Sequence, residues 1–119
     1  MKILVIAEHD NKNIKQSTYS CITAASKISG DVDLFVLGNN MDTVVDESKK
    51  CNHLKTIYFA KSESYERQLA ENLSPVISNF VKENVYTHIL TPSSTFGKNL
   101  SPKIATLLDV QQISDIISI

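Results

Sequence analysis

Ile3-Leu4-Val5-Ile6-Ala7 is an unbroken apolar run that is rich in β-branched residues, and it decides the fold. A strand that is apolar on both faces is typical of the buried interior of a parallel sheet. Similar short runs lie at residues 32–37, 56–60 and 87–91, and a last apolar segment covers residues 113–119. Stretches with helical spacing separate them. This strict alternation predicts an α/β protein: a three-layer α/β/α, Rossmann-like, doubly wound parallel sheet.

The predicted helices lie between these strands. The first is expected from Ser17, with Cys21, Ala25 and Ile28 on its inner face, and Gly30 is expected to end it as a left-handed cap residue.

The start of each later helix has its own signal. Asn40 is expected to cap the second helix. The third is expected from about Tyr65, where Leu69 opens an apolar periodicity, and Pro75 marks either a kink or a restart. The fourth follows a Ser/Thr-rich loop at residues 93–95.

Composition bounds the class of protein. The chain has 119 residues, 12 Lys+Arg against 13 Asp+Glu, and a formal net charge of −1. Only Arg67 is an arginine, so no nucleic-acid partner is expected. There is no apolar run long enough for membrane insertion, and Cys21 and Cys51 make no disulfide framework. We expect a reduced, soluble, intracellular domain.

The chain stops inside or just after its last predicted strand. Ile113, Ile116, Ile117 and Ile119 need cover that no later segment supplies. Residues 1–119 are therefore interpreted as a single incomplete domain, the front of something longer. An open apolar edge of this kind also predicts self-association of the chain.

Two loops are candidates for a binding site, because doubly wound sheets bind ligands beyond the carboxyl ends of their strands. One is residues 8–11 after the first strand, and the other is residues 92–99 after the fourth. The second loop offers hydroxyls, a glycine, a lysine and a helix N-terminus, which could cradle an anion. The candidate residues for such a cleft are Glu8, His9, Ser94, Thr95, Gly97, Lys98 and Asn99.

The specific nucleotide motifs fail at these loops. A phosphate loop needs glycine where Pro92 stands and Ser or Thr where Asn99 stands. The dinucleotide fingerprint needs clustered glycines, whereas the three present are far apart. Gly97-Lys98 is therefore more simply interpreted as a helix entry with a solvated lysine.

The segment Glu8-His9-Asp10 could form an acid–base cluster. No nucleophile is placed beside it, so a polar loop is the favoured interpretation. The three histidines have no metal-ligand spacing with one another or with the cysteines. No catalytic or metal residue is assigned.

Several blocks carry a resemblance to a known family. Residues 1–10 and 69–75 take part, and the specific block runs from Thr95 to Ile116. That block contains Thr95-Phe96-Gly97-Lys98-Asn99, then Pro102, Ala105-Thr106-Leu107-Leu108-Asp109-Val110 and Gln112-Ile113-Ser114-Asp115-Ile116. Together they resemble the amino-terminal domain of the electron transfer flavoprotein alpha subunit, in the same order and over essentially the whole chain.

The resemblance implies an adenine-nucleotide alpha-hydrolase-like fold with strand order 3-2-1-4-5. It implies a beta subunit as partner and one FAD in the full-length heterodimer. It also implies electron transfer from flavin dehydrogenases, such as the acyl-CoA dehydrogenases of fatty acid β-oxidation, to a membrane quinone oxidoreductase. The location would be cytoplasmic in a bacterium and the mitochondrial matrix in an organelle.

The chain departs from the family by lacking the carboxyl-terminal domain with most of the FAD contacts. We therefore expect no FAD on this part, no enzymatic activity, and a scaffold role that includes meeting the beta subunit. The alternatives are a free-standing adenine-nucleotide-binding domain of related fold and an enzyme that uses Glu8-His9-Asp10.

Overall fold

The computed structural model describes residues 1–108 and 115–118, and it contains one parallel sheet. The five strands lie in the order β3-β2-β1-β4-β5, which confirms the expected order 3-2-1-4-5. The strands are β1 (Lys2–Ile6), β2 (Asp31–Gly38), β3 (Thr56–Lys61), β4 (His88–Thr91) and β5 (Asp115–Ser118). The helices are α1 (Gln16–Ile28), α2 (Asp42–Ser48), the short 3-10 helix η1 (Glu63–Tyr65), α3 (Ala70–Glu83) and α4 (Thr95–Leu107).

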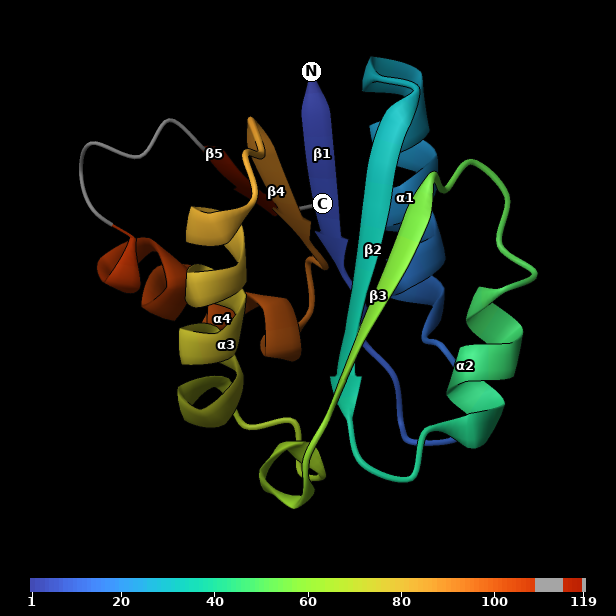
Figure 1. The fold of residues 1–119 in the computed structure, drawn as a ribbon, viewed down its shortest axis with the longest axis vertical. Coiled ribbons are helices and arrows are strands. Elements are labelled where there is room, and N and C mark those ends of the chain that lie inside the picture. The colour runs from blue at the N-terminus through green and yellow to red at the C-terminus, as the bar shows by residue number, and fades with distance from the viewer. Residues whose placement is uncertain (109–114, 119) are drawn as a thin grey trace.

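The sheet is the middle of three layers. Figure 1 shows α1 and α2 on one face and α3 and α4 on the other. The four residues from Ile3 to Ile6 are fully buried, because β1 lies in the centre of the sheet with helices on both sides. The odd-numbered ones, Ile3 and Val5, pack into the α1 and α2 layer, while Leu4 and Ile6 pack against α3 and α4. The predicted three-layer arrangement is confirmed.

The connection from β3 to β4 passes from the edge of the sheet back to its centre. β4 pairs with β1, with Ile3 opposite His88 and Val5 opposite Leu90. The long crossover between residues 60 and 87 therefore carries the chain from the edge strand β3 to a position beside β1.

The third helix begins later than its periodicity predicts. Residues 63–65 form η1, and α3 starts only at Ala70. Gln68 has a left-handed backbone (φ 56°), and its side-chain Nε2 donates to Leu37 O and Tyr65 O, both at 2.7 Å. These bonds hold the chain out of helical geometry, so the predicted start at Tyr65 is wrong. Pro75 lies inside α3 and does not restart it.

Three predictions about helix termini, two at the end of α1 and one at the start of α2, are also wrong. Ile28 is 49% exposed, because α1 ends there, past its buried stripe. Gly30 has no positive φ, and Ser29 ends the helix in extended geometry. Asn40 does not cap α2, because the N-cap position belongs to Met41, whose side chain is fully buried instead.

The predictions for the last segment concern residues that lie largely outside the described part of the chain. The backbone of β5 pairs in parallel with β4, so this part of the sheet edge is occupied. The positions of Ile113 and Ile119 and the side chains of Ile116 and Ile117 lie outside the described part. The expected self-association through them stays a prediction.

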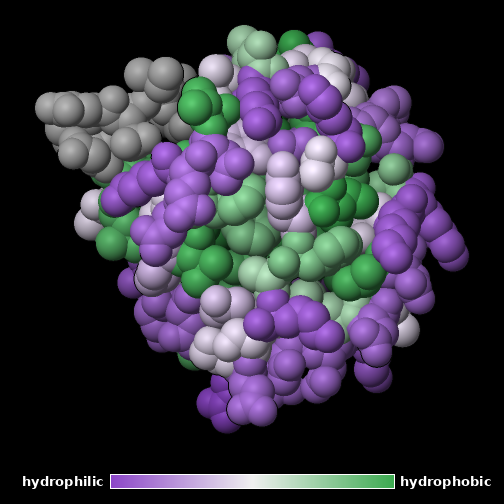
Figure 2. Space-filling model, viewed as in Figure 1, coloured by the Kyte–Doolittle hydropathy of each residue, from purple (hydrophilic) through white to green (hydrophobic). Residues whose placement is uncertain are grey.

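The exposed surface over β3 is apolar. Figure 2 shows hydrophobic side chains gathered there and framed by hydrophilic ones. Phe59 of β3 is 37% exposed, and the neighbouring Ile57 and Tyr58 are half-buried. In the described part of the chain, no helix is long and apolar enough to span a membrane.

Candidate functional site

The candidate site lies where β1 and β4 run side by side. After β1 the chain turns to α1 on one face of the sheet, and after β4 it turns to α4 on the other face (Figure 1). Loops that diverge in this way, at the carboxyl ends of the strands, mark the usual ligand position in doubly wound folds, and the position between these two loops is here called the crevice. Both loops selected from the sequence meet here.

The Glu8 carboxylate joins the two sides of this crevice. Its Oε1 accepts hydrogen bonds from Ser17 Oγ at 2.8 Å, on α1, and from Ser94 Oγ at 2.9 Å, before α4. Ser94 is also the N-cap of α4, since its Oγ accepts from Gly97 N at 3.3 Å. A carboxylate of the chain itself therefore uses the hydroxyls that could have received a phosphate. An incoming anion would also meet its negative charge.

The backbone of Glu8 is also held by hydrogen bonds, all of them to residues at or just before the start of α1. Glu8 N donates to Thr18 Oγ1 at 2.7 Å, and Glu8 O accepts from Thr18 Oγ1 at 3.0 Å and from Lys15 N at 2.9 Å. Thr18 is fully buried on α1. The carboxylate is consequently held in place by the start of α1 and is not a freely moving group.

Gly97 is needed for packing at the entry to α4. A Cβ at this position would lie 1.7 Å from the carbonyl oxygen of Pro92, which is far closer than atoms can approach. The glycine thus lets the first turn of α4 close onto the preceding loop. Thr95, Lys98 and Asn99 are exposed on the same turn. This geometry agrees with a helix entry and a solvated lysine.

His9 binds the end of β2 and not a substrate position. The side chain is 4% exposed, and its Nε2 lies 2.8 Å from Leu37 O. Asn11 N donates to Nδ1 at 3.0 Å, so Nδ1 is unprotonated and Nε2 carries the hydrogen that it donates to Leu37 O. Burial lowers the pKa of His9, against smaller opposing effects of the Leu37 hydrogen bond and of Asp10 and Glu8. The imidazole is therefore neutral and structural.

Asp10, the third residue of the possible acid–base cluster, binds the backbone of the loop that follows it. Its Oδ1 accepts from Asn13 N at 2.7 Å and Lys12 N at 3.0 Å, and these bonds lower the pKa of its carboxyl. Glu8, His9 and Asp10 therefore bind three different partners, and the structure does not bring them together. No group of three potential metal ligands occurs in the residues that the structure describes.

His9 predicts a pH dependence of stability. Its folded pKa is below the unfolded value of about 6.5, so the unfolded state binds the proton more readily. The stabilisation is complete above about pH 6.5 and is lost as the pH falls below it. Urea unfolding at about pH 7.5 and about pH 5.5 should show a larger loss for the native chain than for His9→Gln, which does not titrate. Equal losses in the two proteins would show that His9 is not the linked group.

Sequence reasoning missed Ser17 as a site residue. It was assigned only as the start of a helix, yet its hydroxyl is one of the two that hold Glu8. A Ser or Thr in the first turn after a strand-end carboxylate is the available signal. It is weak, since such residues are common at helix starts for other reasons.

The fold and the site together define a class: a Rossmann-like domain whose switch-point crevice is closed by its own carboxylate and lacks a glycine-rich phosphate loop. Comparison with known proteins gives the family. The family model described as "Electron transfer flavoprotein domain" matches residues 3–119. The chain belongs to this family.

The similar curated proteins are alpha subunits. The chain is 40% identical over 119 residues to "Electron transfer flavoprotein subunit alpha" of Pseudomonas aeruginosa, covering 100% of this chain and 38% of that protein. It is 41% identical to the mitochondrial alpha subunit of Dictyostelium discoideum, covering 95% of this chain and 34% of that protein. The resemblance found in the sequence is confirmed, and the chain spans about a third of the length of these relatives.

Proposed function

We propose that the chain is the amino-terminal scaffold part of an electron transfer flavoprotein alpha subunit. With a beta subunit, the whole protein would carry electrons from flavin dehydrogenases, such as acyl-CoA dehydrogenases, to a quinone oxidoreductase. The observation that carries the proposal is the match to alpha subunits along the entire chain. In this role the chain is part of an electron carrier and not an enzyme.

The residues at the switch point do not fit FAD. A flavin dinucleotide needs a glycine-rich turn for its pyrophosphate, whereas this crevice holds the Glu8 carboxylate between Ser17 and Ser94. We therefore place the FAD of the heterodimer on other parts of the complex, and no electron-transfer step is assigned to residues of this chain.

The surface of the domain supports a partner-binding role. Contiguous exposed apolar area is typical of protein interfaces, and the surface over β3 that includes Phe59 is of this kind (Figure 2). A rigid central sheet with such a surface is suited to support neighbouring domains and to meet a beta subunit. The location would follow the organism: the cytoplasm of a bacterium, or the mitochondrial matrix, in keeping with the eukaryotic relatives that are named mitochondrial.

The proposal predicts that the chain binds no flavin. Purified protein should be colourless, and calorimetric titration with FAD should show no saturable binding, because the Glu8 carboxylate already binds the hydroxyls of Ser17 and Ser94 and would repel the pyrophosphate. A yellow protein with flavin close to one per chain would contradict the scaffold role. Riboflavin, which lacks the pyrophosphate, is the matched control for nonspecific stacking.

A free-standing adenine-nucleotide-binding domain is the second candidate, favoured by the hydroxyls and the helix N-terminus between Pro92 and Asn99. It requires micromolar binding of AMP or ATP that is lost in Lys98→Ala. In the scaffold role the same cleft is vestigial, and binding is at best millimolar, about 4 kcal/mol. Titration with AMP therefore separates the two functions independently of the FAD result.

A further inference from the structure

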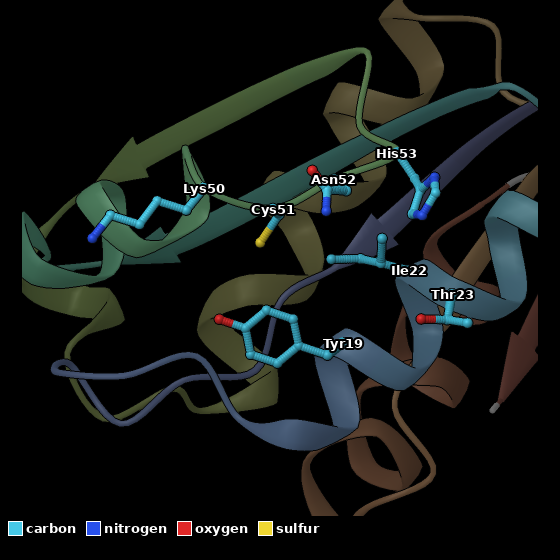
Figure 3. A pocket seen from close by; sticks show the side chains of 7 residues that line it. All are labelled: Tyr19, Ile22, Thr23, Lys50, Cys51, Asn52 and His53. Carbon is cyan, nitrogen blue, oxygen red and sulfur yellow. The ribbon is translucent and has the colours of Figure 1, made fainter.

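Three cavities adjoin one another along the outer side of α1. The first, of about 290 Å³, lies between α1 and the connection from α2 to β3. Figure 3 shows Tyr19, Ile22 and Thr23 of α1 facing Cys51, Asn52 and His53 of that connection. The second cavity, of about 420 Å³, shares Tyr19 and Thr23 with the first, and the third, of about 380 Å³, shares His53. The surface that these three neighbouring cavities line is here called the basic groove.

The charge of this groove has one sign. Lys27, Lys50 and Lys55 line it and are exposed, and the exposed His53 belongs to the same lining. Among the described residues that line the three cavities there is no Asp or Glu. The whole chain has a net charge of −1, so this concentration of cations on one surface is a local feature.

Nearby carboxylates reduce this positive charge only in part. Glu47 lies behind Tyr19 and accepts from Tyr19 OH at 2.8 Å and from Ile14 N at 3.0 Å, so it is engaged with the protein. Lys55 Nζ is 3.9 Å from Asp31 Oδ1. Lys27 and Lys50 are therefore the cations on which recognition of an anion would mainly depend.

Part of the groove's lining is apolar, and α1, which lines it, is long enough for an extended peptide to lie along it. Ile22 is 4% exposed, Leu54 and Cys51 are half-buried, and burial raises the pKa of the Cys51 thiol, which remains neutral. α1 has 13 residues, which at ~1.5 Å per residue is about 20 Å. A peptide in extended conformation covers that distance with about six residues.

We propose that the basic groove docks an extended acidic segment of a partner protein. Alternate side chains of such a segment would place carboxylates near Lys27 and Lys50 and small apolar groups over Ile22 and Leu54. Nucleic acid is a weaker match, since none of the residues that line the groove is an arginine. The surface is distinct from the Glu8 crevice, so the inference does not depend on the proposed function.

The test uses a fluorescein-labelled peptide of about eight residues in which glutamate alternates with valine. Fluorescence anisotropy at low ionic strength should show saturable binding to the chain. The double variant Lys27→Glu/Lys50→Glu should weaken it at least about tenfold. The matched control, Lys61→Glu/Lys82→Glu, makes the same change in net charge at exposed positions outside the groove and should bind almost as the native chain does.

Two further measurements locate and classify the ligand. Amide chemical-shift changes on adding the peptide should concentrate at residues 19–27 and 50–55, and the glutamine version of the peptide should not bind. Circular dichroism of the variants confirms folding. The proposal is overturned if the native chain does not bind, or if both double variants weaken binding equally. It is also overturned if a single-stranded oligonucleotide or phosphatidylserine vesicles bind more tightly than the peptide.

Discussion

Replacing Gly97 with alanine is expected to destabilise the domain by about 3 kcal/mol or more. The added Cβ would lie 1.7 Å from Pro92 O and 2.8 Å from Pro92 C. Both are backbone atoms, so the overlap cannot be relieved by rotating a side chain. The first turn of α4 would have to move away from the loop, and the Ser94 cap and its bond to Glu8 would be disturbed. Urea unfolding measures the loss.

Gly30→Ala is the matched control for this prediction. A Cβ at Gly30 has no neighbour within 4 Å, and its backbone does not have a positive φ. We expect that variant to unfold within about 0.5 kcal/mol of the native chain. A Gly97→Ala variant as stable as Gly30→Ala would show that the entry to α4 is not packed as described.

Tyr86→Phe is expected to cost about 2–3 kcal/mol. Tyr86 OH donates to Asp33 Oδ2 at 2.7 Å, and both side chains are almost fully buried. Burial and this bond raise the pKa of Tyr86, so the phenol stays protonated as a donor. Asp33 Oδ1 has no hydrogen-bond partner among the described residues, so losing Tyr86 OH would leave a buried carboxylate poorly satisfied.

The ring of Tyr86 also packs, but phenylalanine keeps that contribution. The Tyr86 ring centroid lies 6.0 Å from the Phe80 ring centroid, and Lys2 Nζ lies 4.9 Å from the Tyr86 centroid. Thermal and urea unfolding of Tyr86→Phe therefore report mainly on the hydroxyl. The double variant Asp33→Val/Tyr86→Phe removes both polar partners and should be more stable than Tyr86→Phe alone. A double variant that is less stable would show that Asp33 is satisfied in another way.

The three layers of the fold could be predicted because a strand that is buried on both faces has a recognisable run of apolar residues. The run from Ile3 to Ile6 is apolar on both faces, and this occurs where helices cover both sides of a strand. The start of α3 could not be predicted in the same way. Leu69 continues the helical spacing of Leu73 and Ile77, but the left-handed Gln68 depends on Leu37 O from a distant strand.

The candidate crevice was only partly predictable for the same reason. Its two loops followed from the rule that ligand sites lie at carboxyl ends of strands. The role of Glu8 did not follow, because its partners are 9 and 86 residues away in sequence and meet it only after folding. Gly97 appeared in the sequence as part of a possible phosphate cradle, whereas its contact with Pro92 gives it a packing role.

We propose that this chain is the scaffold of an alpha subunit, and that it meets a beta subunit without holding flavin itself. Size-exclusion chromatography with light scattering of the chain mixed with its purified beta subunit tests this proposal. We predict a complex of one chain with one beta subunit, from which excess full-length alpha subunit displaces the chain. Separate elution of the two proteins at every concentration would contradict the claim.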